Sequence, residues 1–218
     1  METVTADNPS ETERLLQSVI DGDQESWGTL LIRYEKRLRR MVAYRMDQRL
    51  QGRIDPLDVI QDAYLEASEH REEYVRQPGV PFYLWLRGIV GNKLLEVHRH
   101  HLGTQMRDAC REVSLYRGKM PEASSAALAA QLLGHATRPS EAAIRAEVKI
   151  YLQEALNSMD PLDREALVLR HFEQLSPPEV AQVLGIKEKA AGMRYLRALK
   201  RLKDILICLP GGLKDLRS

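Results

Sequence analysis

This sequence has little of what secreted and membrane proteins require. It holds two cysteines, Cys110 and Cys208, in 218 residues, too few and too far apart for a disulfide framework. No apolar run approaches the roughly 20 residues that cross a bilayer, and the acidic, polar N-terminus is unlike a signal peptide. We therefore expect a reduced, cytoplasmic protein without a membrane partner.

Motifs that support catalysis are also missing. The sequence has no nucleophile elbow, no phosphate-cradling glycine loop, and no Cys-x-x-Cys or His-Glu-x-x-His metal set. His98, His100 and His101 end a basic run that fits either a helix C-terminus complementing its dipole or a phosphate contact. A hydrolase using an acidic helix with these histidines is a poorly supported alternative. We expect no enzyme, no metal and no cofactor.

Strand signals are nearly absent, and aromatic residues make up only 6% of the chain. Apolar residues at helical spacing predict helices over Gln24–Arg45 and Phe82–His101, with Phe82 and Trp85 in the core. Another helix starts after Asp55, and a loop is expected over Arg71–Pro81 because it contains two prolines and a glycine. These features predict an all-α fold.

Two small helical domains joined by a linker account for the pattern. The first is expected over residues 10–102, the linker over 103–140 with a short helix at Ser125–Leu133, and the second domain over 141–208. In the linker the helical periodicity fades, and glycine, proline and small residues take its place.

Charge is segregated along the chain although the net charge is only +1. Residues 33–53 carry eight Lys/Arg against two acids, about +6, and residues 54–73 carry seven acids against one Arg, about −6. Within the acidic segment, carboxylates recur every three or four residues and form one acidic stripe, beside which Gln61 lies: Asp58, Asp62, Glu66, Glu69 and Glu73. The stripe fits either a solvated face or a surface for a basic partner.

The sequence of Ser176–Lys203 predicts a helix-turn-helix. Ser176 and Glu179 can form a capping box, Pro177 suits the first helical position, and Gly185 stands at the turn, where φ > 0 is expected. The second helix carries seven Lys/Arg against Glu188, a charge near +6 that suits phosphate binding. The competing interpretation is an amphipathic hairpin with a solvated basic face.

Helix-turn-helix geometry sorts the candidate DNA contacts. Early residues of the second helix face base edges, and later basic residues meet the backbone. The base-contact candidates are Lys187, Glu188, Lys189, Met193 and Arg194. The phosphate-contact candidates are Arg197, Lys200 and Arg201. Tyr74 and Tyr83 could stack on exposed bases if the first domain binds single strands.

Taken together, these motifs resemble an RNA polymerase sigma factor of the extracytoplasmic-function type, over roughly Glu13–His101 and Ala146–Leu206. The marks are Asp58-Val59-Ile60-Gln61-Asp62-Ala63-Tyr64, Pro81-Phe82-Tyr83-Leu84-Trp85-Leu86 followed by Asn92-Lys93, Leu184-Gly185-Ile186, and Arg197-Ala198-Leu199-Lys200-Arg201-Leu202. Two positions depart from the family pattern. Gly192 stands where members commonly have a basic or polar residue, and Ala191 where they have a branched apolar one.

The resemblance implies a role for each domain. Asp58, Gln61 and Asp62 would dock on the clamp helices of the polymerase's largest subunit. The Arg71–Pro81 loop and the following helix would engage the non-template strand of the minus-ten element, with Tyr83 as a base contact and Asn92, Lys93 and Arg99 on phosphates. The second domain would read the minus-thirty-five element as duplex.

The expected function is promoter recognition and opening at transcription initiation. The expected partners are core RNA polymerase, through its clamp helices and flap region, and promoter DNA, while an anti-sigma factor is an open partner. The alternative is a stand-alone helix-turn-helix regulator with a helical sensor domain, which would have no use for the Asp58–Gln61–Asp62 surface.

Overall fold

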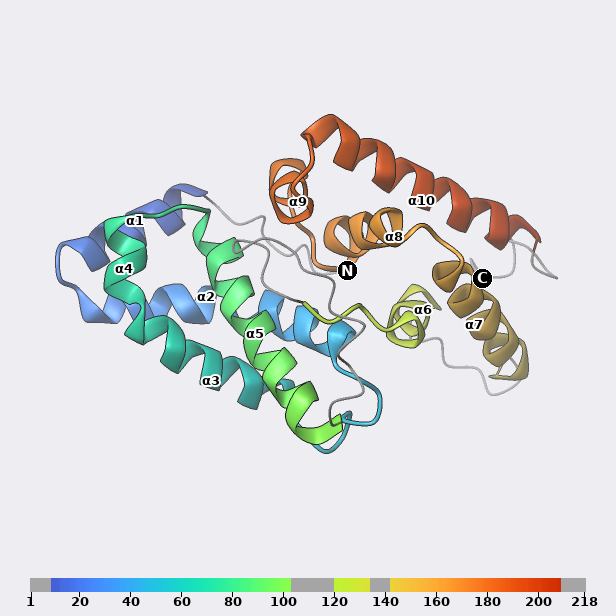
Figure 1. Ribbon diagram of the computed structural model, residues 1–218, viewed down its shortest axis with the longest axis horizontal. Coiled ribbons are helices and arrows are strands. Elements are labelled where there is room, and N and C mark those ends of the chain that lie inside the picture. Colours follow the sequence, from blue (N-terminus) through green and yellow to red (C-terminus); the bar gives the residue numbers. More distant parts are fainter. Residues whose placement is uncertain (1–8, 103–119, 134–141, 209–218) are drawn as a thin grey trace. The chain divides into compact units, whose positions relative to one another are not determined.

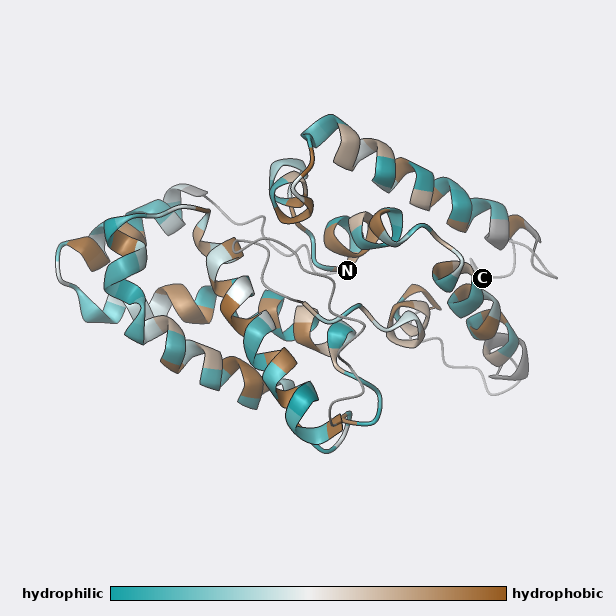
Figure 2. Ribbon diagram, in the orientation of Figure 1, coloured by the Kyte–Doolittle hydropathy of each residue, from teal (hydrophilic) through white to brown (hydrophobic). Residues whose placement is uncertain are grey.

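The computed structural model describes residues 9–102, 120–133 and 142–208, and its regular elements are helices (Figure 1). The all-α prediction is confirmed. The chain forms two compact units, one of residues 1–42 and 52–120 and one of residues 43–51 and 121–218. Hydrophobic and hydrophilic residues alternate along the helices, as helices that bury one face require (Figure 2).

The described part of the first unit contains five helices, of which α3 and α5 pack against each other. The core contains six large side chains with no exposed surface: Leu30, Leu38, Met41, Ile60, Leu86 and Leu94. The helices are α1 (Pro9–Ile20), α2 (Gln24–Arg45, whose last turn belongs to the second unit), α3 (Pro56–Glu69), α4 (Arg71–Arg76) and α5 (Phe82–Leu102). The bounds expected for α2 and α5 agree with these to within one residue.

Local sequence explains where α3 begins and which side it buries. The Asp55 side chain accepts a hydrogen bond from the Leu57 backbone N–H at 2.9 Å, and Pro56 takes the first helical position. Four small or branched residues then form the buried side: Val59, Ile60, Ala63 and Ala67. The carboxylates of Asp58 and Asp62 are left on the opposite, exposed side of the helix.

The loop expected over Arg71–Pro81 is helical in its first half, so that prediction was wrong for residues 71–76. Glu72 and Glu73 in the first turn and Arg76 in the last turn complement the dipole of α4. Only residues 77–81, where Pro78 and Pro81 stand, connect α4 to α5 without helix.

An aromatic cluster holds this connection in place. Tyr74 stacks on Trp85 with ring centroids 4.5 Å apart, and the edges of Trp27 and Tyr74 meet Phe82 at 5.6 Å. The Tyr74 hydroxyl donates to the Val80 carbonyl at 3.0 Å, which ties the end of the loop back to α4. Phe82 is buried in the core, as predicted.

The second unit closes around α10. This helix packs along α8, α9 and α7, and α6 packs on α7. The core includes Leu128, Leu152, Leu156, Leu167 and Val168, all 1% exposed or less. The elements are α6 (Ser125–Leu133), α7 (Ala142–Asn157), α8 (Pro161–Leu167) continued by the π-helix η3 (Val168–Phe172), α9 (Pro177–Leu184) and α10 (Glu188–Cys208).

The short helix expected at Ser125–Leu133 is present as α6, and it belongs to the second unit. Leu128 and Ala129 are fully buried in that unit's core. The unit boundary therefore falls at residue 121, inside the segment expected as linker. Residues 103–119 and 134–140 of the expected linker, with Cys110, lie outside the described residues, as does residue 141 of the expected second domain.

Residues 43–51 contribute a buried cation to the second unit. The Arg45 guanidinium, 1% exposed, lies 2.5 Å from Glu165 and 2.6 Å from Glu173, and donates to the Pro121 carbonyl at 2.8 Å. Burial by itself would lower the pKa of Arg45, but the two carboxylates raise it overall. A buried ion pair with its hydrogen bonds satisfied is costly to break from one side.

Candidate functional site

The outward side of α3 presents the three residues singled out for docking. Asp58, Gln61 and Asp62 are all exposed. Leu65 lies on the same side and is 69% exposed, an unusual position for a leucine beside carboxylates. Sequence reasoning missed Leu65, although its place outside the 59/60/63/67 buried series was a signal for it. The exposed face of α3 is therefore acidic with an apolar centre.

A second exposed apolar side chain of the first unit is on α2. Ile32 is 68% exposed. The Tyr64 hydroxyl of α3 donates to the Leu31 carbonyl at 2.8 Å, which fixes this part of α2 beside α3. Burial raises the pKa of Tyr64.

The acidic stripe does not remain fully open to solvent. Lys93 of α5 lies 2.7 Å from Glu66 and 3.3 Å from Glu96. The hydrogen bond that Lys93 donates to the Glu66 carboxylate raises the pKa of Lys93. Three residues are expected on minus-ten phosphates. Lys93 is held by ion pairs within the protein, whereas Asn92 and Arg99 are exposed on one side of α5.

Tyr83 is placed differently from the expectation. It is 3% exposed, its ring centroid lies 5.4 Å from that of Tyr34, and the Arg37 guanidinium carbon lies 3.6 Å from its centroid. The structure does not present this ring to a nucleic acid. Tyr74 is also buried, and burial raises its pKa to about 12.

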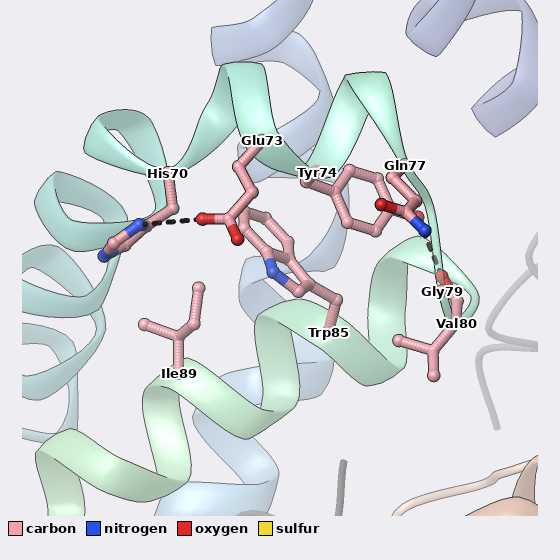
Figure 3. Close-up of a pocket in the computed structure, with 8 residues that line it drawn as sticks. All are labelled: His70, Glu73, Tyr74, Gln77, Gly79, Val80, Trp85 and Ile89. Carbon is pink, nitrogen blue, oxygen red and sulfur yellow. Dashed lines mark hydrogen bonds and ion pairs between the residues drawn. The ribbon is translucent and has the colours of Figure 1, made fainter. Parts of the chain in front are cut away.

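A shallow cavity of about 220 Å³ opens between α4, the 77–81 connection and α5 (Figure 3). Its wall includes the edge of the Tyr74–Trp85 stack, with His70 and Glu73 at one end and Gln77 at the other. His70 Nδ1 lies 3.6 Å from a Glu73 carboxylate oxygen. The cavity thus combines an aromatic wall with hydrogen-bonding groups at its rim.

The helix-turn-helix has the local geometry that its sequence predicts. Ser176 N–H donates to Glu179 at 2.6 Å, and Glu179 N–H donates to the Ser176 hydroxyl at 3.4 Å, which completes the capping box. Gly185 has φ 59° and ψ 41°. Its N–H and that of Ile186 donate back to the Gln182 and Ala181 carbonyls, as a Schellman ending requires.

Three arginines of α10 donate hydrogen bonds to side chains of the second unit. Asp163 of α8 accepts from Arg194 at 2.7 Å and from two nitrogens of Arg197 at 2.9 and 3.1 Å. Asp160 accepts from Arg194 at 3.0 Å, and Arg201 donates to the Ser158 hydroxyl at 3.3 Å. Burial by itself would raise the pKa of Asp163, but the two arginines lower it overall.

The side of α10 farthest from the core is a different row, which we call the outer ridge: Lys189, Met193, Leu196 and Lys200. All four are exposed, Met193 at 50% and Leu196 at 58%. They recur four, three and four residues apart and so share one face. Lys187 and Glu188, at the start of the helix, are exposed as well. Sequence reasoning missed Leu196, which lies outside the buried Ala191–Ala198–Leu202 row.

Within residues 9–102, 120–133 and 142–208, no three His, Cys, Asp or Glu side chains are grouped as a metal site would need. Over the same part of the chain, no helix is long and apolar enough to cross a membrane.

Comparison with known protein families finds two matches, one for each half of the chain. Residues 31–102 match the model described as sigma-70 region 2, and residues 149–202 match that of sigma-70, region 4. The first match contains α3 and α5, and the second contains the helix-turn-helix.

Individual relatives agree with these matches. The chain is 26% identical to RNA polymerase sigma factor CarQ of Myxococcus xanthus, over 85% of this chain and 92% of that protein. It is 28% identical to sigma factor CnrH of Cupriavidus metallidurans over 91% and 96%, and 30% identical to the ECF sigma factor SigD of Mycobacterium tuberculosis over 69% and 62%.

A solved structure, that of CnrH in complex with the cytosolic domain of CnrY, has the same fold. It superposes with a TM-score of 0.51 at 24% identity and covers 90% of this chain and 97% of that one. Region 2 and region 4 occur here in the order and over the length of these relatives. The chain belongs to the extracytoplasmic-function (ECF) family of RNA polymerase sigma factors.

Proposed function

We propose that this protein binds core RNA polymerase through the exposed face of α3 and directs it to promoters that it reads with both units. It performs no bond chemistry of its own. Core polymerase and promoter DNA are the partners that the ECF family implies, and both lie in the cytoplasm, where we expect the protein to act.

The observation that carries the proposal is the composition of the α3 face. Asp58, Gln61 and Asp62 are exposed beside Leu65, so carboxylates surround an apolar side chain. Interfaces combine a desolvated apolar centre with a polar rim that steers the partner. A basic surface with an apolar spot would complement this arrangement, and the family resemblance assigns that surface to the clamp helices. A stand-alone regulator would leave it unused.

In the first unit, the non-template strand would pass along α5 and the cavity beside it. Asn92 and Arg99 are available for phosphates, and Lys93 could join them only by leaving Glu66. Melting a promoter requires a place for an extruded base, because unstacking costs a few kcal/mol that contacts must offset. The aromatic-walled cavity at Trp85 and Gln77 suits that purpose better than the buried ring of Tyr83.

In the second unit, α10 would enter the major groove of the minus-thirty-five element. Lys187, Glu188, Lys189, Met193 and Lys200 are exposed for this contact. Arg197 and Arg201 are exposed as well, but Arg194 and Arg197 donate to Asp163 and Arg201 donates to Ser158. The polymerase flap is the expected protein partner of this unit. An anti-sigma factor is a further proposed partner, since the relative CnrH was solved with the cytosolic domain of CnrY.

A core-binding experiment tests the proposal. The double variant Asp58→Lys/Asp62→Lys should lose core polymerase in a pull-down, because it sets positive charge against a basic surface. The control Glu13→Lys/Glu72→Lys makes the same charge change at exposed carboxylates of α1 and α4 and should bind as the parent does. Unchanged binding by the Asp58/Asp62 variant would remove the main support for the proposal.

A further inference from the structure

The outer ridge of α10 has an unusual composition for a surface that meets DNA. Its two ends are Lys189 and Lys200, but its centre is Met193 and Leu196, which are 50% and 58% exposed. Neither central side chain offers a strong hydrogen-bond donor for a base edge. Whatever occupies the ridge must therefore present an apolar spot between anionic groups.

The base-contact candidate Arg194 is engaged by an acid of the second unit, and so is the phosphate-contact candidate Arg197. Arg194 and Arg197 both donate to Asp163, whose side chain is only 13% exposed. Charge-assisted and bidentate hydrogen bonds of this kind are the strong ones. Asp163 is itself fixed at the start of α8, where its backbone N–H donates to the Asp160 cap at 3.1 Å. Bidentate contact of Arg194 with guanine, the commonest kind of specific contact in the major groove, would require Arg194 to leave Asp163.

One feature of the major groove matches the ridge. The C5-methyl group of thymine is the apolar group that base pairs present there, and phosphates flank it on both strands. We propose that Met193 and Leu196 read thymine methyl groups in the upstream promoter element, while Lys189 and Lys200 hold the adjacent phosphates. The inference rests on the proposed function and adds the base that α10 selects and the side chains that select it.

Replacing thymine by uracil tests this directly, because uracil lacks the methyl group and keeps the hydrogen-bonding pattern. Holoenzyme assembled from core polymerase and this protein is first used to select promoters from a randomised library. Each thymine of the upstream element is then replaced in turn, and holoenzyme affinity is measured by competition. At least one replacement should weaken binding about fourfold, the effect of about 0.8 kcal/mol for one buried methyl-sized group.

The same replacement in variant holoenzymes assigns the effect to a side chain. In Leu196→Ala or Met193→Ala the penalty for uracil should vanish, since no apolar partner faces the methyl. In the control Ile150→Ala, which truncates an exposed apolar residue of α7, it should persist.

The outcomes separate the two claims. Equal affinity for thymine and uracil at every position would overturn the inference. A uracil penalty that survives in both α10 variants would also overturn it. Either result would leave the ridge as a surface for a protein partner. Failure to select any promoter would overturn the proposed function instead.

Discussion

Gly192 is the residue of α10 whose replacement has the most clearly defined expected effect. It stands in the interior of the helix, where a glycine loses more backbone entropy on folding than any other residue. A Cβ at this position would meet no heavy atom within 4 Å among the described residues, its own helix backbone aside. Gly192→Ala should therefore add a methyl group without a clash.

The expected gain is about 1 kcal/mol, the difference between glycine and alanine in a helix interior. Much of it comes from the unfolded chain, which alanine makes less flexible. For a domain of about 100 residues, 1 kcal/mol corresponds to a rise of about 4–8 °C in Tm. The transition of the second unit should move by this amount, and that of the first unit should not move.

Scanning calorimetry of the full chain measures both transitions. Two further glycine variants provide controls. Gly88→Ala in α5 also has open space and should stabilise the first unit, whereas Gly185→Ala places a Cβ at φ 59° and should destabilise the second unit by about 1–2 kcal/mol. If Gly192→Ala lowers the stability of the second unit, the helix has a constraint at this position that the structure does not contain, and the reasoning fails.

Three other predictions concern the DNA-binding unit. Ser176→Ala removes one side of the capping box and should lower the free energy of unfolding, measured in urea, by about 1 kcal/mol. In a Glu179→Ala background the box is already broken, so the same substitution should lower it much less. Asp163→Asn removes the charged acceptor of Arg194 and Arg197, so each arginine becomes available to a phosphate. The slope of log K for duplex DNA against log salt concentration should then become more negative by about 1 to 2. An unchanged slope would mean that the arginines already contact phosphate in the parent. The pKa of Asp163 is lower in the folded protein than in the unfolded chain, so its ionised carboxylate stabilises the fold fully above the unfolded pKa near 3.8. This stabilisation is lost as the pH falls from that value through the lowered folded pKa. Acid unfolding of the parent and of Asp163→Asn measures the difference.

Helix ends were predictable because the chemistry that sets them is local. Asp55, Ser176 and Gly185 each act on backbone groups within five residues, and each behaves as the sequence predicts. The error at residues 71–76 has the same origin. The prolines after Arg76 favour a loop, and the prediction rests on them alone. The charges at the two ends of α4 favour a helix.

Long-range pairings were not predictable from the charge pattern. Asp163 lies 31 and 34 residues from its two arginines, and a basic helix alone does not reveal which of its charges a carboxylate will hold. Tyr83 illustrates the same limit. Its place beside the loop suggested exposure, but α5 is buried around much of its circumference and takes Tyr83 into the core.

Transcription in vitro tests the central claim most directly. Core RNA polymerase alone and core with this protein are compared on a randomised promoter library, and the start sites of the transcripts are sequenced. The account predicts that the protein selects start sites preceded by two conserved elements, one for each unit. Identical transcripts with and without the protein would contradict it.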